Sequence, residues 1–314
     1  MRRLLLLILL AGACAHSRPG ASATPSASEN ASATETDERR HGAKGAEEPI
    51  PLPHVVVDSS TGNPLDELEL ADRLRAARAI YVGEEHPNPH HHAVELEVLE
   101  RAYAADPSLA LGLEMLPRTM QAPLDNFVSG ALDEDAFLAA VDWKKTWGYP
   151  WGFYRPLLVF CREHRLRAWA LNAPRSLAHA VAQRGLDGLT PDEKRALPEL
   201  VPGPEAHREF VREAFGAHPH GKFSGDQFER FYAAQLVWDE TMADGVASAL
   251  AAPDAPRRMV VVAGEGHVRR FAVPQRAARR GVAPFVTILP ALDEDRADAL
   301  KERAADLLWV LATH

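Results

Sequence analysis

Two stretches far apart in this chain share one sequence pattern, IYVGEEH at residues 80–86 and VVVAGEGH at residues 260–267. Each is a short apolar run that ends in Gly-Glu-x-His, and such runs, bounded by glycine and polar residues, are typical of buried β-strands. Two further runs end in a polar side chain, one at Glu114 and one at Asn172. Because ligands bind beyond the carboxyl ends of the strands in open parallel sheets, we expect these four strand ends to share one crevice.

Strand-like and helix-like segments alternate along most of the chain. Helical patterns cover about 88–105, 156–164 and 227–250. Asn88 and Pro89 suit the cap and the first helical position of the first of these helices. This alternation predicts the α/β class, with a mainly parallel sheet and helices on both faces. Buried strands are predicted at His54–Asp58, Ala79–Gly83, Leu109–Glu114, Arg167–Leu171, Met259–Ala263 and Phe285–Leu289.

Two segments, about 115–155 and 187–225, interrupt the alternation. We interpret both as helical insertions that form a small helical lid subdomain over one edge of the sheet. Long insertions of this kind often serve as lids or binding elements.

The chain begins with features of an export signal. Two arginines precede the apolar run Leu4–Leu10, and small residues then lead to Cys14. We interpret residues 1–14 as a lipoprotein signal peptide with Cys14 as the lipidated residue; an ordinary cleaved signal is the alternative. Residues 15–48 lack periodicity and apolar content, which predicts a disordered tether before a folded domain at 49–314. The protein is therefore expected to be exported and held by its lipid at the cell envelope, with the outer membrane as the expected location.

Composition limits the classes of function. A formal net charge of −9 argues against nucleic acid as a partner, because phosphate binding needs an excess of Lys and Arg. Of the two cysteines, Cys14 lies in the signal region, so an internal disulfide with Cys161 is not expected. Cys161 itself lies in an apolar helical stretch and is expected to be a buried, unreactive thiol.

The two Gly-Glu-x-His turns could bring acids and imidazoles together. If the backbone stays extended, residues two apart project to one side, so Glu84 would lie beside His86 and Glu265 beside His267. With Glu114 between them, this set suits a divalent metal such as Zn or Mn, or general acid–base chemistry. We expect His86, Glu114 and His267 as metal ligands, with Glu84 or Glu265 as the general base. The alternative is that each turn merely caps a strand through hydrogen bonds.

Three other features allow two interpretations each. Residues 143–154 hold six aromatic side chains, which could form a wall for a flat ligand, with a tyrosine that ligates haem iron, or could pack as a lid on the sheet edge. His90, His91 and His92 could contribute to a metal site, although a solvated helix start is the favoured interpretation. Asp239 lies four residues after Gln235 on one helical face and could reach the crevice or satisfy a loop backbone.

Taken in order, these motifs resemble the ChaN-like haem-binding lipoproteins, within the superfamily that also holds the Tiki and TraB-type proteins. The resemblance covers most of residues 54–290 and rests on the stretches 81–86, 112–115, 147–156, 171–175, 235–243 and 262–268.

The resemblance implies an α/β fold with a small helical subdomain, a lipid anchor, and a role in haem or iron uptake. It further implies haem at the interface of a homodimer with tyrosine ligation, for which Tyr149 and Tyr154 are the nearest candidates. The Tiki branch implies instead a metal-dependent protease that uses His86, Glu114 and His267. A haem-binding lipoprotein and a metal-dependent hydrolase are therefore both expected functions, and a scaffold that keeps the crevice without chemistry is a third.

Overall fold

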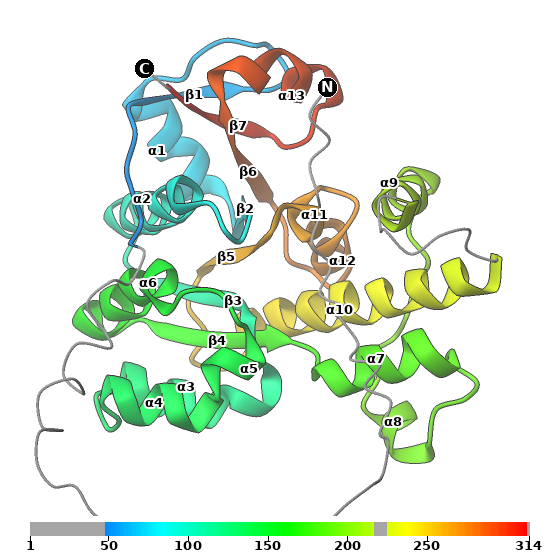
Figure 1. The fold of residues 1–314 in the computed structure, drawn as a ribbon. Coiled ribbons are helices and arrows are strands. Elements are labelled where there is room, and N and C mark those ends of the chain that lie inside the picture. Colours follow the sequence, from blue (N-terminus) through cyan, green and yellow to red (C-terminus); the bar gives the residue numbers. More distant parts are fainter. Residues whose placement is uncertain (1–47, 217–224, 313–314) are drawn as a thin grey trace, which may run out of the picture. The chain divides into compact units, whose positions relative to one another are not determined.

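A seven-stranded sheet forms the centre of the computed structural model, which describes residues 48–216 and 225–312 (Figure 1). The strands lie in the order β1-β7-β6-β2-β5-β3-β4, and every neighbouring pair is parallel except β1 with β7. The predicted α/β class with a mainly parallel sheet is confirmed. The strands are β1 (His54–Asp58), β2 (Ala79–Glu84), β3 (Leu109–Pro117), β4 (Arg167–Asn172), β5 (Arg258–Gly264), β6 (Phe285–Leu292) and β7 (Leu307–Leu311).

The sequence analysis found six of these strands and missed β7. The run Leu307–Leu311 is apolar throughout and fully buried, and a short apolar run does not distinguish a strand from a buried helical segment. In the structure this run forms β7, which pairs with β1 in antiparallel orientation.

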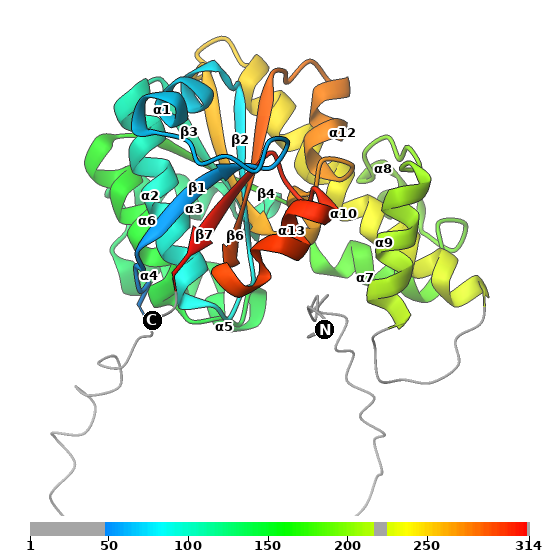
Figure 2. The ribbon, with the colours of Figure 1, turned by 90° about the horizontal axis from the view of Figure 1, so that it is seen from above.

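Helices cover both faces of the sheet, as predicted (Figure 2). Alternate residues of β2 face opposite layers, so Ile80 and Val82 pack with one group of helices and Tyr81 with the other. The first layer contains α1 (Glu67–Ala76), α2 (Pro89–Ala105), α3 (Gln121–Val128), α4 (Glu134–Val141), α5 (Trp143–Thr146) and α6 (Trp151–His164). The second contains the C-terminal part of α10 (Gly225–Ala251), with α12 (Val273–Arg279) and α13 (Arg296–Glu302).

The two predicted insertions are both helical, but they occupy different places. The first contributes α3, α4 and α5, whose buried side chains belong to the main core. The second contains α8 (Pro191–Arg195) and α9 (Glu205–Gly216). We call these two helices, α7 (Arg175–Arg184) and the first half of α10 the helical satellite. Within it, α7, Leu189 and α10 share a small core that includes Leu177, Val181 and Val237, and α9 packs against α10.

The signal peptide, Cys14 and nearly all of the tether lie outside the described residues, so the predicted anchor and location stay predictions. Within residues 48–216 and 225–312, no helix combines the length and apolar character needed to cross a bilayer. Cys161 is fully buried, as predicted.

Candidate functional site

Three neighbouring strands place the central side chains of the site. β5 lies between β2 and β3, and Glu84 at the end of β2 is opposite Gly264 at the end of β5. Glu114 of β3 accepts a hydrogen bond of 2.6 Å from the Gly264 N–H, and its other oxygen lies 3.4 Å from His267 Nε2. A Cβ placed on Gly264 would lie 3.3 Å from His86 Nε2 and 3.6 Å from the Glu114 carboxylate. The two imidazoles and Glu114 thus converge on one place, as the strand ends predicted.

Glu84 holds His86 from behind. Its carboxylate is buried and lies 2.6 Å from His86 Nδ1, and it also accepts a hydrogen bond of 3.0 Å from the Tyr154 hydroxyl. Burial alone would raise the pKa of Glu84, but the positive charges of His92 and His86 outweigh it and hold the pKa below its usual range. An ionised carboxylate enclosed in this way orients His86 and does not meet solvent, so it is poorly placed to act as the expected general base.

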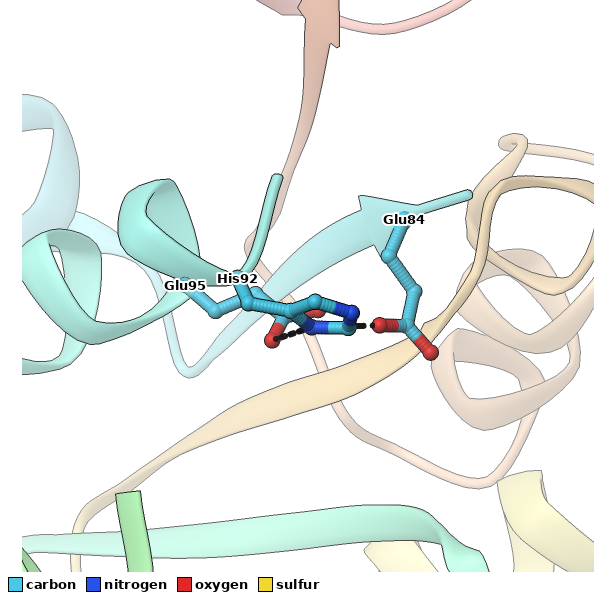
Figure 3. A group of neighbouring side chains, drawn as sticks. All are labelled: Glu84, His92 and Glu95. Carbon is cyan, nitrogen blue, oxygen red and sulfur yellow. Dashed lines mark hydrogen bonds and ion pairs between the residues drawn. The ribbon is translucent and has the colours of Figure 1, made fainter. Parts of the chain in front are cut away.

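Behind Glu84 lies a second buried imidazole (Figure 3). His92 Nδ1 lies 2.9 Å from Glu84 and 3.0 Å from Glu95, and its Nε2 lies 3.0 Å from the carbonyl oxygen of His86. A carbonyl oxygen can only accept, so Nε2 carries a proton. Burial lowers the pKa of His92, but the two carboxylates outweigh it and raise it to about 11.

Glu84, His92 and Glu95 are, among the described residues, the one set of three acidic or imidazole side chains whose ligand atoms all lie within 4.8 Å of one another. Their separations are hydrogen-bond distances, and all three side chains are closed to solvent. Burial and the charge of Glu84 raise the pKa of Glu95 well above its usual value, which favours a proton shared within the set. We therefore interpret this set as a proton-holding cluster behind His86.

The favoured prediction of a solvated start for α2 was wrong. His91 is 6% exposed and His92 is completely buried. Nδ1 of His91 accepts a hydrogen bond from the Glu85 N–H, and burial lowers the pKa of His91 to about 4. The loop after β2 folds back over the first turn of α2, and helical periodicity does not reveal this loop path. Asn88 does cap the helix, as predicted.

His267 is held in the same way from the other layer. Its Nδ1 lies 2.6 Å from the fully buried carboxylate of Asp239 and 3.2 Å from Gln235, both on α10. Asp239 therefore reaches the crevice, which was one of the two predicted alternatives. Burial lowers the pKa of His267, but Glu114 and Asp239 outweigh it and raise it to about 9. His86 and His267 keep 14% and 12% of their side-chain surface exposed, so both can meet a solute.

The two Gly-Glu-x-His turns are alike in sequence but differ in conformation. Glu84 and His86 project to one side, as an extended backbone predicts, but residues Glu265–Val268 form a short helix, α11. Glu265 therefore points away from His267 and pairs with Arg269 at 2.9 Å. Burial raises the pKa of Glu265. The expectation that Glu265 lies beside His267 was wrong, because a helical turn separates residues two apart by about 200°.

Gly83 and Gly264 lie so close to neighbouring residues that a side chain at either position would crowd them. A Cβ on Gly264 would lie 2.9 Å from Cε1 of the His86 ring, and a Cβ on Gly83 would lie 3.1 Å from the Cα of Glu265. Each strand end therefore leaves room for the turn that follows the neighbouring strand.

The aromatic segment is mostly core, and part of it borders the site. Trp143, Phe153 and Tyr154 are buried in the main core. Trp147 and Tyr149 surround the His86 ring, with ring centroids 4.8 Å and 5.0 Å away. Tyr149 is half-buried, and burial followed by the charge of Glu84 raises its pKa.

Several residues of the site were not identified from the sequence. Glu95 offered a signal, since it is a charged residue among the apolar positions of α2 and lies three residues after His92. His207, which lies 3.2 Å from Asp239, offered none, because it is one of three histidines in a segment interpreted as an insertion, and it belongs to no motif. Asn172 was also predicted at a strand end, and its side chain accepts a hydrogen bond from the N–H of the next residue, Ala173.

Comparisons with known proteins place the chain. Residues 70–277 match the family described as "Haem-binding uptake, Tiki superfamily, ChaN". A solved structure of Campylobacter jejuni ChaN with cofacially bound haem is similar in fold, with a TM-score of 0.61 and 16% identity over 82% of this chain and 96% of that one. The Arabidopsis thaliana chloroplast protein RETICULATA-RELATED 5 is 26% identical over 79% of this chain, but the match spans only 36% of that relative. This chain belongs to the ChaN family of the Tiki superfamily.

Proposed function

We propose that this protein binds haem at the open side of the histidine site, with Tyr149 as the iron ligand. The observation that carries the proposal is the difference between the two candidate tyrosines. The Tyr154 hydroxyl is buried and donates to Glu84, whereas Tyr149 is half-buried and its ring centroid lies 5.0 Å from that of the partly exposed His86. Tyr149, which packs against the buried Trp147, offers a partly exposed aromatic ring that a flat, apolar macrocycle could cover. The family description supports the ligand class.

Tyr149 can bind haem iron through its phenol oxygen once the phenol has lost its proton. The raised pKa of Tyr149 means that its phenol is protonated at neutral pH, so ferric iron must displace that proton to bind the oxygen. In the Campylobacter protein the haems are bound cofacially. We extend this to a homodimer of the present chain, in which two copies cover the haem faces.

The test is a hemin titration of the purified protein followed by absorption spectroscopy. We expect a Soret band at stoichiometric hemin, and about tenfold or more weaker binding in Tyr149→Phe because an iron ligand is lost. Tyr103→Phe is the matched control, since Tyr103 packs against Phe160 and His164 elsewhere. A wild-type spectrum that does not change with hemin would exclude the proposal.

A second function is favoured by the imidazole pair itself, namely metal-dependent hydrolysis. Both Nδ1 atoms face buried carboxylates, which leaves each Nε2 directed to the place where Glu114 also lies. Histidines that bind metals are usually held in this way by a carboxylate on their other nitrogen. His86, His267 and Glu114 would hold a divalent ion such as Zn or Mn, which when bound would supply a water of lowered pKa.

In this reaction the chain's own residues have defined tasks. Glu84 and Asp239 orient the two imidazoles, and the Gly264 N–H fixes Glu114. Glu84 is enclosed and Glu265 is paired with Arg269, so neither of the two expected general bases is free to meet an attacking water.

Elemental analysis of the purified protein, before and after zinc or manganese loading, tests the second function. We expect about one ion per chain, lost in His86→Gln and in His267→Gln, because each variant removes a ligand. His179→Gln, an exposed histidine of α7, should leave the metal content unchanged. Folded protein that cannot be loaded with either metal would rule this function out.

A further inference from the structure

The helical satellite contributes one side chain to the buried support of the site. His207 on α9 is 1% exposed, and its Nε2 lies 3.2 Å from Asp239 Oδ2, a buried oxygen that makes no hydrogen bond of standard geometry to the described residues. The other oxygen of the same carboxylate holds His267 Nδ1. We propose that His207 is a positioning residue that fixes the Asp239 carboxylate and thereby orients His267. The inference deepens the proposed function, since it rests on His267 as a working residue of that site.

The surroundings of His207 assign its proton. Nδ1 lies 3.2 Å from the Arg276 guanidinium and 3.3 Å from the Tyr232 hydroxyl. A guanidinium can only donate, so Nδ1 accepts and the ring proton lies on Nε2. The Tyr232 oxygen already accepts from the Gly203 N–H, which leaves its own proton free to point toward Nδ1. The Nε2–H group therefore faces Asp239.

His207 Nε2 is the nitrogen nearest to Asp239 Oδ2. The carboxylate is fully buried, and beside Oδ2 stand His207 Nε2 at 3.2 Å and Arg276 Nε at 3.7 Å. Arg276 is also committed to Glu240 and to the Val201 carbonyl. Without the His207 proton, a desolvated oxygen would lose its nearest donor, and a carboxylate free to rotate toward Arg276 would release His267.

The loop before α9 is shaped around the His207 ring. A Cβ on Gly203 would lie 2.3 Å from His207 Nδ1 and 2.9 Å from its Cβ, so no larger residue fits there. This close approach provides a variant that disturbs the ring without removing it, namely Gly203→Ala.

The experiment follows the hydrogen-bonded proton between His267 Nδ1 and Asp239 by proton NMR of the full, metal-free and haem-free protein. At 2.6 Å this proton should resonate far downfield, and it is assigned by its loss in His267→Gln. We expect the signal to disappear or move upfield in His207→Leu and in Gly203→Ala. His207→Gln should restore it, because the Gln amide can donate from nearly the place of Nε2. His179→Gln, on α7 of the same satellite, should leave it unchanged.

Each outcome decides the inference. A downfield signal that is unchanged in folded His207→Leu and Gly203→Ala shows that His207 only packs, and so does a signal that His207→Gln fails to restore. If His207→Leu does not fold, His207→Gln and Gly203→Ala still give the comparison. The NMR signal is measured without haem or metal, so a failure of either proposed function would not change the result of this test. A negative result in this test would likewise not contradict either proposed function.

Discussion

At the scale of single residues, the site consists of two imidazoles that are each held by a carboxylate, with a second imidazole behind that carboxylate. On one side the order is His86, Glu84, His92, and on the other it is His267, Asp239, His207. The two sets end differently. Glu95 lies behind His92 and favours a shared proton, whereas the guanidinium of Arg276 lies 3.2 Å from Nδ1 of His207.

Glu84 should therefore be more important for stability than a surface acid. Glu84→Gln removes the buried charge that faces His86 and His92, and breaking a buried ion pair costs about 3–5 kcal/mol of unfolding free energy. Chemical denaturation measures this loss. Glu97→Gln, whose side chain is 30% exposed on α2, should cost less than about 1 kcal/mol. Equal losses in the two variants would contradict the role assigned to Glu84.

At the scale of elements, neighbouring strand ends make room for each other's turns. The turn after β2 carries His86 across the end of β5, where Gly264 leaves the space for its ring. The turn after β5 is the helix α11, which aims His267 at α10 and Glu265 at Arg269.

Gly264→Ala tests this packing. The added methyl would overlap the His86 ring, so we expect a loss of about 1–3 kcal/mol of unfolding free energy and a shift of the His86 ring resonances in NMR spectra. Gly225→Ala is the control, because a Cβ there meets open space. Unchanged His86 resonances in Gly264→Ala would show that the ring does not lie against this strand end.

At the scale of the whole molecule, the buried ionisable groups make stability depend on pH. The pKa of His267 is about 9 in the folded chain against 6.5 as its ordinary value, so its contribution is complete below about pH 6.5 and is lost as the pH rises through 9. In metal-free protein we expect the free energy of unfolding to fall by about 3 kcal/mol over this interval. His267→Gln should show a smaller fall, measured by denaturation at a series of pH values. An equal fall in both proteins would contradict the raised pKa.

The carboxylates act in the opposite direction. The pKa values of Glu84 and Asp239 are held below 4.5 and 3.8, so the stability that they contribute is present above those values and is lost in acid. The protein is therefore expected to unfold in acid as these two groups gain protons.

The α/β class, six of the seven strands and the meeting of His86, Glu114 and His267 could be predicted from the amino-acid sequence. These follow from local rules, since apolar runs mark strands and parallel strands end at one edge. Identical motifs did not determine identical geometry, and Glu265 faces away from His267 because α11 is helical.

The groups that lie behind the two imidazoles could not be predicted, because they come together only in the folded chain. His92 and Glu95 come from α2, Asp239 from α10 and His207 from α9, and their meeting depends on which helix covers which strand end. Periodicity reports which face of a helix is buried, but not which buried group it will touch. Burial then sets the protonation of these groups, because in a low-dielectric interior a charge persists only beside its partner.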